Sequence, residues 1–400
     1  MVRAFLFLGV PRGLLFPMTI WSSYMWMKTV GYSNTVVGLC GLLAVPSLLK
    51  LPFFPYLLRV QWGRLFGLCN KAGLLCFFAL LCSSAVIMAA LFTPCNLLPF
   101  LICMSIAAFS TSVIETALEV LRLDSASFSV PGMHSDWVAS QLGTGDRIGC
   151  LLGNPLLLLM VSFSSWTVAL CVLAVLFLLF ISAVRSLNAL WALEEEETRK
   201  SSIDVMSALR DLFCRWGYVV YTLPCLMLLS EALVRPMIGV MLLDRGFSLR
   251  EISLGYGISY VGGVFGARCM LRFFPARANA TRLYWSGSIN SLMSASYSLL
   301  WMWPSTTACM ILMFCSGWTQ SVFLLFVRIS LGDLCSRSYQ FIQMAFFLSL
   351  WVAMAIFSTL AGWLSSVVEW RYYFVIVGII FVPCGYFASV ILKKTRVKAS

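Results

Sequence analysis

Charged residues are scarce in this sequence: Asp, Glu, Lys and Arg together make up 11% of its 400 residues, whereas hydrophobic residues make up 60%. No polar stretch is long enough to build the core of a soluble domain, and the mean hydropathy of the chain is +0.91. A water-soluble domain of this size needs a far more polar surface, so these scarcities exclude a soluble fold. Runs of about 20 apolar residues, the length of a membrane-spanning helix, recur along the whole chain. We therefore predict an all-α membrane protein.

Several kinds of site are excluded by what is missing. His134 is the only histidine, and the 15 cysteines are scattered without a CxxC pair, so we expect no metal site and no disulfide. The sequence has no phosphate-binding loop, ATPase motif or catalytic constellation, so we expect no cofactor and no enzyme. The formal net charge is +12; in a membrane protein we assign it to topology and anionic lipid, and expect no nucleic-acid partner.

The apolar runs predict twelve transmembrane helices in two sets of six. They lie near residues 4–27, 35–57, 70–93, 97–121, 138–161 and 163–185, and near residues 217–241, 251–272, 283–303, 305–332, 340–364 and 370–391. This pattern divides the chain into a six-helix bundle at 1–185, a cytoplasmic linker with an interfacial helix at 186–216, and a second bundle with a basic tail at 217–400.

A local echo supports an internal repeat. Gly31-Tyr32-Ser33 opens the second predicted helix and Gly246-Phe247-Ser248 opens the eighth. Two six-helix halves with parallel repeats, joined by a polar linker, are the plan of a major-facilitator transporter. Basic residues gather on the side of this topology that carries the linker and the C-terminal tail, so we predict that both termini are cytoplasmic.

Ionisable side chains inside membrane helices are the candidate functional residues, because each one needs a partner, a wet cavity or a function. Glu115, Glu119 and Arg122 share one face of the fourth predicted helix at spacings of four and three. Two close carboxylates can take up and release a proton, while Arg122 can hold the deprotonated form. We assign the three residues to proton coupling; the alternative is a structural ion pair at the cytoplasmic mouth.

Single cations in apolar surroundings are candidates for a substrate cavity. Arg12 and Lys50 could attract a carboxylate, although Lys50 could also reach the membrane interface. Arg147 lies beside a glycine-rich helix face that favours close helix contact. It could pair with Glu119 or Asp124 on another helix, or it could bind an anionic substrate.

Glu231 and Arg235 are four residues apart and precede Pro236. The pair could neutralise itself, but the proline suggests a bend at a cavity, so both are assigned to substrate binding. Ser248 and Glu251 have the spacing of a helix capping box. We assign gating roles to six residues: Asp146, Ser248, Glu251, Arg328, Asp333 and Arg337.

Several stretches match one family. They are the opening Gly9-Val10-Pro11-Arg12-Gly13-Leu14, the two acids and arginine at 115–122, Arg147-Ile148-Gly149, Gln343 in the eleventh helix and, most specifically, Leu242-Leu243-Asp244-Arg245-Gly246-Phe247-Ser248. Over almost its whole length the sequence resembles the AmpG-type muropeptide permeases, a major-facilitator branch related to acetyl-CoA transporters. It departs from them at Glu115 and Glu119, where the family has Asp, and at Leu58, where the family has an acid.

The resemblance implies proton-coupled import of an anhydro-muramyl disaccharide bearing a short peptide. It implies alternating access, a location in the bacterial inner membrane, and a substrate-binding role for Gln343. We expect a monomer whose partners are a small-molecule substrate, protons and membrane lipid. Two alternatives stay open: transport of another anionic metabolite, such as a CoA thioester or a nucleotide, and a non-transporting membrane sensor on the same scaffold.

Overall fold

The computed structural model describes residues 6, 9–14, 17–50, 53, 56, 57, 60–92, 96–127, 135–186, 205–273, 279–336 and 339–399. A helical segment at 9–14 is followed by η1 (Pro17–Trp21, a π-helix), α2 (Ser22–Val30), α3 (Asn34–Gly38), η2 (Leu39–Leu49, a 3₁₀-helix), α5 (Trp62–Phe66), α6 (Asn70–Phe92), α7 (Leu97–Ser127), α8 (Ser135–Phe163) and α9 (Trp166–Ser186). The second half has α11 (Val205–Trp216), α12 (Val219–Asp244), α13 (Leu249–Phe273), α14 (Asn279–Met302), α15 (Thr306–Leu334), α16 (Gln340–Ala355), α17 (Phe357–Val367) and α18 (Trp370–Ala399).

Each predicted membrane segment coincides with one helix or with consecutive helical segments. Among the described residues, seven helices are long and apolar enough to cross a membrane. A multi-pass membrane protein is therefore confirmed, while the count of twelve spans and the division into two bundles stay predictions. Residues 187–204 of the predicted linker lie outside the described residues, and the rest of the linker forms α11.

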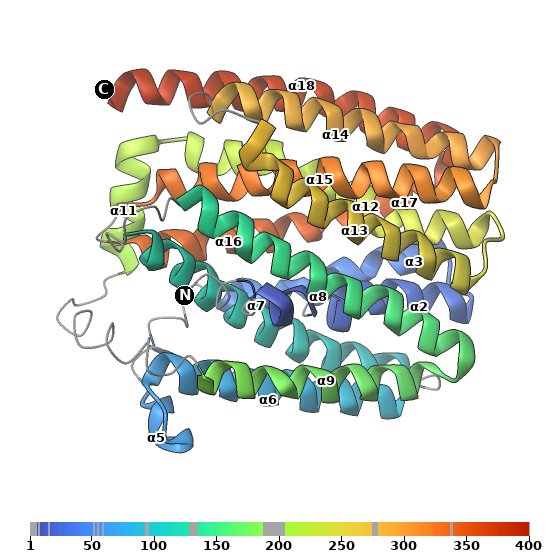
Figure 1. Cartoon of the computed structure of the whole chain (residues 1–400), viewed down its shortest axis with the longest axis horizontal. Coiled ribbons are helices and arrows are strands. Elements are labelled where there is room, and N and C mark those ends of the chain that lie inside the picture. Colours follow the sequence, from blue (N-terminus) through green and yellow to red (C-terminus); the bar gives the residue numbers. More distant parts are fainter. Residues whose placement is uncertain are drawn as a thin grey trace.

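The long helices run in roughly the same direction through the molecule (Figure 1). α11 and the C-terminus lie at one end, which we call the linker end, and the connection from α2 to α3 lies at the opposite end (Figure 1). α13 packs against α15 and also against α8 from the N-terminal half of the chain. The two halves of the chain therefore meet along the length of the bundle.

The two repeated turns have the same geometry. Gly31 (φ 100°) and Gly246 (φ 90°) adopt the left-handed conformation that glycine tolerates best. In both turns the glycine N–H and the N–H that follows it donate to carbonyls of the preceding helix at 3.0–3.1 Å. Ser33 caps α3 in the first turn, and Ser248 and Glu251 form the predicted capping box in the second. The structure therefore confirms the local echo and the capping box.

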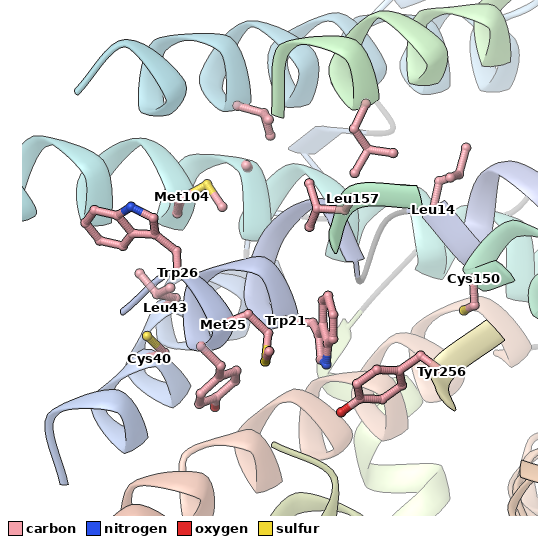
Figure 2. Close-up of a cluster of buried hydrophobic side chains, with 14 of the residues drawn as sticks. Leu14, Trp21, Met25, Trp26, Cys40, Leu43, Met104, Cys150, Leu157 and Tyr256 are labelled. Carbon is pink, nitrogen blue, oxygen red and sulfur yellow. The ribbon is translucent and has the colours of Figure 1, made fainter. Parts of the chain in front are cut away.

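Large buried side chains form a core that includes residues from both halves of the chain. Figure 2 shows Trp21, Met25, Trp26 and Tyr256 within this core. The ring of Trp21 meets the ring of Tyr256 edge-on, with their centroids 5.0 Å apart. This aromatic contact joins η1 of the N-terminal half to α13 of the C-terminal half.

Glycines let the first helical segment approach α8 closely. A Cβ on Gly13 would overlap the carbonyl of Asp146, and a Cβ on Gly149 would overlap the carbonyl of Val10. The predicted glycine-lined face of the fifth helix is thus a contact face. The contact brings the segment that carries Arg12 against the part of α8 that carries Asp146.

Candidate functional site

Five charged side chains from four helical segments form what we call the carboxylate cluster: Arg12, Glu115, Glu119, Asp146 and Arg328. Arg12 extends from the segment at 9–14, and its Nη2 lies 3.1 Å from Glu115 Oε1 while its Nη1 lies 2.6 Å from Glu119 Oε1. Both glutamates extend from α7, where their spacing of four places them on one face. The structure therefore gives the predicted pair of acids an arginine partner from the first helical segment.

Glu119 is the central residue of this cluster. Its side chain is 0% exposed. Its Oε1 contacts Arg12 from the N-terminal half and lies 3.7 Å from Arg328 Nε on α15 of the C-terminal half. Asp146 repeats the arrangement at 3.9 Å from Arg12 Nε and 3.8 Å from Arg328 Nη1. The buried carboxylate of Glu119 and the half-buried carboxylate of Asp146 therefore hold one guanidinium from each half of the chain.

Lys50 lies buried beside this cluster. Its Nζ donates a hydrogen bond to Ser112 Oγ on α7 at 2.7 Å, and it is close enough to Glu115 to interact with it electrostatically. The side chain is fully buried. Lys50 therefore faces the interior of the bundle, and the alternative of a lysine that reaches the membrane interface is wrong.

A second group, which we call the amide cluster, contains Arg147, Glu231, Arg235, Asn290 and Gln320. Gln320 Oε1 accepts from Arg147 Nη1 at 3.3 Å and from Arg235 Nη2 at 3.1 Å. Gln320 Nε2 donates to one oxygen of Glu231, and Asn290 Nδ2 donates to the other at 3.1 Å. Arg235 Nε also lies 4.0 Å from Glu231.

Sequence reasoning missed Gln320 and Asn290 because it searched for ionisable residues. An uncharged amide inside an apolar helix is a weaker form of the same signal, since it too requires a hydrogen-bond partner. The partner predicted for Arg147 was Glu119 or Asp124, or a bound anion. The structure gives Arg147 the oxygen of Gln320.

A third group links the two halves at the opposite end of the bundle. Lys28 Nζ lies 2.6 Å from Asp244 Oδ1 and donates to Asn34 Oδ1 at 2.7 Å. Asp244 Oδ2 accepts from Asn34 Nδ2 at 3.3 Å and from Trp370 Nε1 at 3.0 Å. We call this group the opposite-end latch, because α2 and α3 supply two of its residues and α12 and α18 supply the others.

Gln343 lies at the linker end, away from both central clusters. Its Nε2 donates to Asp211 Oδ2 of α11 at 2.8 Å, and its Oε1 accepts from Arg215 Nη2 at 3.2 Å. Burial acts to raise the pKa of Asp211, but hydrogen bonds from Arg215 and Gln343 outweigh it and hold the pKa below its usual range. Gln343 therefore attaches α11 to α16, and the structure does not bring it together with the other predicted substrate-binding residues.

The remaining predicted residues are dispersed. The side chain of Arg122, and Arg337 as a whole, lie outside the described residues. Asp333 is exposed near the linker end of α15. Ser248 and Glu251 form the exposed capping box at the opposite end, where Glu251 also accepts from Thr306 at 2.8 Å. Within the described ranges, no group of three His, Cys, Asp or Glu side chains has the geometry of a metal site.

No family model matches the chain. Curated relatives match it over nearly its whole length. The putative transporter AmpG 2 of Rickettsia typhi is 22% identical over 409 residues, covering 98% of this chain and 95% of the relative. The protein of the same name from Rickettsia bellii is 22% identical over 410 residues, covering 94% and 93%. The resemblance to AmpG-type proteins is therefore confirmed.

Solved structures of transporters share the fold. A POT family transporter in complex with a thioalcohol-conjugated peptide has a TM-score of 0.70 and 10% identity, with 98% of this chain and 96% of that chain covered. A D-xylose-proton symporter has a TM-score of 0.67 and 14% identity, with 97% of each chain covered. These neighbours and the curated relatives are transporters and not enzymes. The chain is a multi-pass membrane protein that shares the fold of these transporters and is similar over nearly its whole length to the AmpG transporters.

Proposed function

We propose that this protein imports anhydro-muramyl peptides by proton symport, with two six-helix bundles that give access to a central site from alternate sides. Similarity to the AmpG transporters supports the substrate class, because the sequence motifs of the muropeptide permeases extend along the chain. We place the protein in a bacterial inner membrane, with the linker end and both termini in the cytoplasm. The opposite end then faces the periplasm.

The observation that carries the coupling proposal is the position of Glu119. Its carboxylate oxygen contacts a guanidinium from each half of the chain. Protonation removes the negative charge that attracts both arginines, so the link between the halves weakens at this level. Removing one partner of a buried ion pair costs about 3–5 kcal/mol, which corresponds to a shift of roughly a hundredfold or more between two conformations.

This arrangement gives the order of events for import. A deprotonated Glu119 holds the linker side closed while the central site is open to the periplasm. A proton that arrives from the periplasm removes the attraction of Glu119 for Arg12 and Arg328. Asp146 still contacts both arginines at the longer distances, so the link is weaker and the linker side opens more easily. Loss of the proton to the cytoplasm restores the ion pairs and resets the transporter. Proton occupancy and the side of access are thereby tied to one carboxylate.

The experiment is uptake of a radiolabelled anhydro-muramyl peptide into proteoliposomes, with and without an imposed pH gradient. We expect wild-type protein to concentrate the peptide and to lose this ability when a protonophore is added. Glu119→Gln should abolish gradient-driven uptake while retaining exchange of internal for external peptide. Glu369→Gln, which changes an exposed carboxylate far from the cluster, is the matched control.

Each part of the proposal can fail separately. Undiminished gradient-driven uptake by Glu119→Gln would contradict the coupling role of this residue. Absence of uptake by folded wild-type protein would contradict the substrate assignment. A CoA thioester and a nucleotide would then be tested by counter-exchange.

A further inference from the structure

Gln320 lies between charges of both signs although it carries none itself. The oxygen end of its amide faces the guanidinium groups of Arg147 and Arg235, and the nitrogen end faces the carboxylate of Glu231. An amide oxygen and nitrogen are separated by about the same distance as the carboxylate and ammonium of an α-amino acid. The neutral amide of Gln320 is thus surrounded by charged groups that would suit a ligand with one negative and one positive charge.

Burial makes this mismatch energetically important. Arg147 is 4% exposed and Gln320 is 9% exposed, so neither is well hydrated. Charged groups that leave water need strong compensating contacts. The present hydrogen bonds to Gln320 each have one ionised partner. A second ionised partner would add Coulomb attraction, which is stronger in a poorly hydrated interior than in water. A carboxylate would therefore satisfy the two arginines better than the amide oxygen, and an ammonium would satisfy Glu231 better than the amide nitrogen.

We propose that Gln320 holds the place of a zwitterionic head group of the substrate. The ligand's carboxylate would lie between Arg147 and Arg235, and its ammonium would contact Glu231. This inference rests on the proposed transport function and deepens it: the part of a muropeptide that binds here is a peptide side chain that carries a free amino group and a free carboxyl group on one carbon. A sugar ring or a phosphate lacks the ammonium that Glu231 selects.

Glu231 keeps two partners in the amide cluster when the Gln320 side chain moves away. Asn290 still donates to Glu231 at 3.1 Å, and Arg235 still lies 4.0 Å from the same carboxylate. About a quarter of the Arg235 side chain, 27%, is accessible to solvent, so one side of the cluster is open to an incoming group. The site can therefore exchange its internal amide for a ligand without leaving Glu231 unpaired.

The exchange also acts on the conformation. Arg147 belongs to α8 in the N-terminal half, whereas Arg235 and Glu231 belong to α12 in the C-terminal half. A bound zwitterion would replace the hydrogen bond from Arg147 to a neutral amide by an ion pair between the halves. Because a ligand shifts an equilibrium by its differential affinity for the two states, occupancy favours the state in which the halves are closed around the site.

The test uses the purified full-length protein and three small probes: alanine, alaninamide and N-acetylalanine. Each is titrated while the unfolding temperature is recorded. Alanine carries both charges, alaninamide lacks the carboxylate and N-acetylalanine lacks the ammonium. We expect wild-type protein to need about tenfold or more of either blocked probe for the stabilisation that alanine gives, because each lost contact is a charged hydrogen bond.

Three variants locate the two contacts. Glu231→Gln should lose the preference for alanine over N-acetylalanine but keep the preference over alaninamide, and Arg147→Gln should do the reverse. Gln320→Leu removes the internal competitor without changing the side-chain size greatly, so alanine should bind several-fold more tightly. If Gln320→Leu does not fold, the crossed effects of the other two variants still decide the question.

Equal responses to the three probes, no response of wild-type protein to alanine, or identical effects of both charge variants would overturn the inference. Uptake of the anhydro-muramyl peptide is measured on the same preparation. If the anhydro-muramyl peptide is taken up but the three probes bind equally well, the head-group inference is overturned and the proposed transport function is not. Charge selection without muropeptide uptake supports the site and overturns the proposed substrate.

Discussion

The opposite-end latch gives a prediction whose size can be worked out from its geometry. Asp244 accepts from Lys28, Asn34 and Trp370, and the first two belong to the N-terminal half of the chain. Opening of this end requires that these contacts break. Replacement of Asp244 should therefore raise the population of molecules in which the end is open.

The ion pair is partly exposed, with side-chain exposures of 15% for Lys28 and 26% for Asp244, so solvent screens it. We assign it about 1 kcal/mol, the upper end of the range for exposed pairs. Asp244→Asn keeps an acceptor for Trp370 and should shift the opening equilibrium about fivefold. Asp244→Leu also removes the hydrogen bond that Asn34 donates across the halves, for a total of about 2 kcal/mol and a shift of about thirtyfold.

Hydrogen exchange of the backbone amides in α3 and the turn before it reads this equilibrium directly, because exchange there accelerates in proportion to the open population. Glu369→Gln is the control. It breaks the 2.7 Å ion pair between Glu369 and Arg371, which lies at the start of α18 and does not connect the two halves of the chain. Exchange that changes by less than twofold in both Asp244 variants would refute the reasoning. A Lys28→Met and Asp244→Asn double-mutant cycle with no coupling energy would refute it as well.

Three further predictions concern other parts of the fold. Ser248→Ala removes one side of the capping box and should lower the free energy of unfolding by about 1 kcal/mol, measured by thermal unfolding. Asp211→Asn should accelerate hydrogen exchange in α11 at neutral pH. The pKa of Asp211 in the folded protein is lowered, so its carboxylate fully stabilises the attachment of α11 above the usual carboxyl pKa. The exchange rate of α11 in wild-type protein should rise to that of the variant only as the pH falls through the folded pKa. Gly13→Val should lower the unfolding temperature and the gradient-driven uptake together, because the new side chain overlaps the carbonyl of Asp146.

Helix positions were largely predictable because long apolar runs have few alternatives in a membrane. The run predicted at 70–93 is the single helix α6 (Asn70–Phe92). Breaks within runs were not predictable. The first predicted helix contains a π-helical turn that begins at Pro17, and the second continues as a 3₁₀-helix that contains Pro46. Both departures depend on packing against neighbouring helices, which a single sequence does not reveal.

The candidate site shows the same division. Glu115 and Glu119 were recognised because their spacing along one helix is a local property. Their arginine partner Arg12 is more than 100 residues away in sequence, so no local pattern could indicate the pair. Lys28 was not among the predicted site residues, and Gln320 carries no charge. The residues that connect the two halves are thus the ones that sequence reasoning identified least well.

The repeated turns at Gly31 and Gly246 have one more consequence. Two copies of the same structural unit could in principle associate with themselves, as identical subunits do around a two-fold axis. Here the helix before the first turn ends with the cation Lys28, and the helix before the second ends with the anion Asp244. Two N-terminal halves would bring two lysines to this end without the aspartate that pairs with Lys28. The charge difference therefore specifies which half is the correct neighbour when the chain inserts and assembles, so separately expressed halves should reconstitute only as an unlike pair.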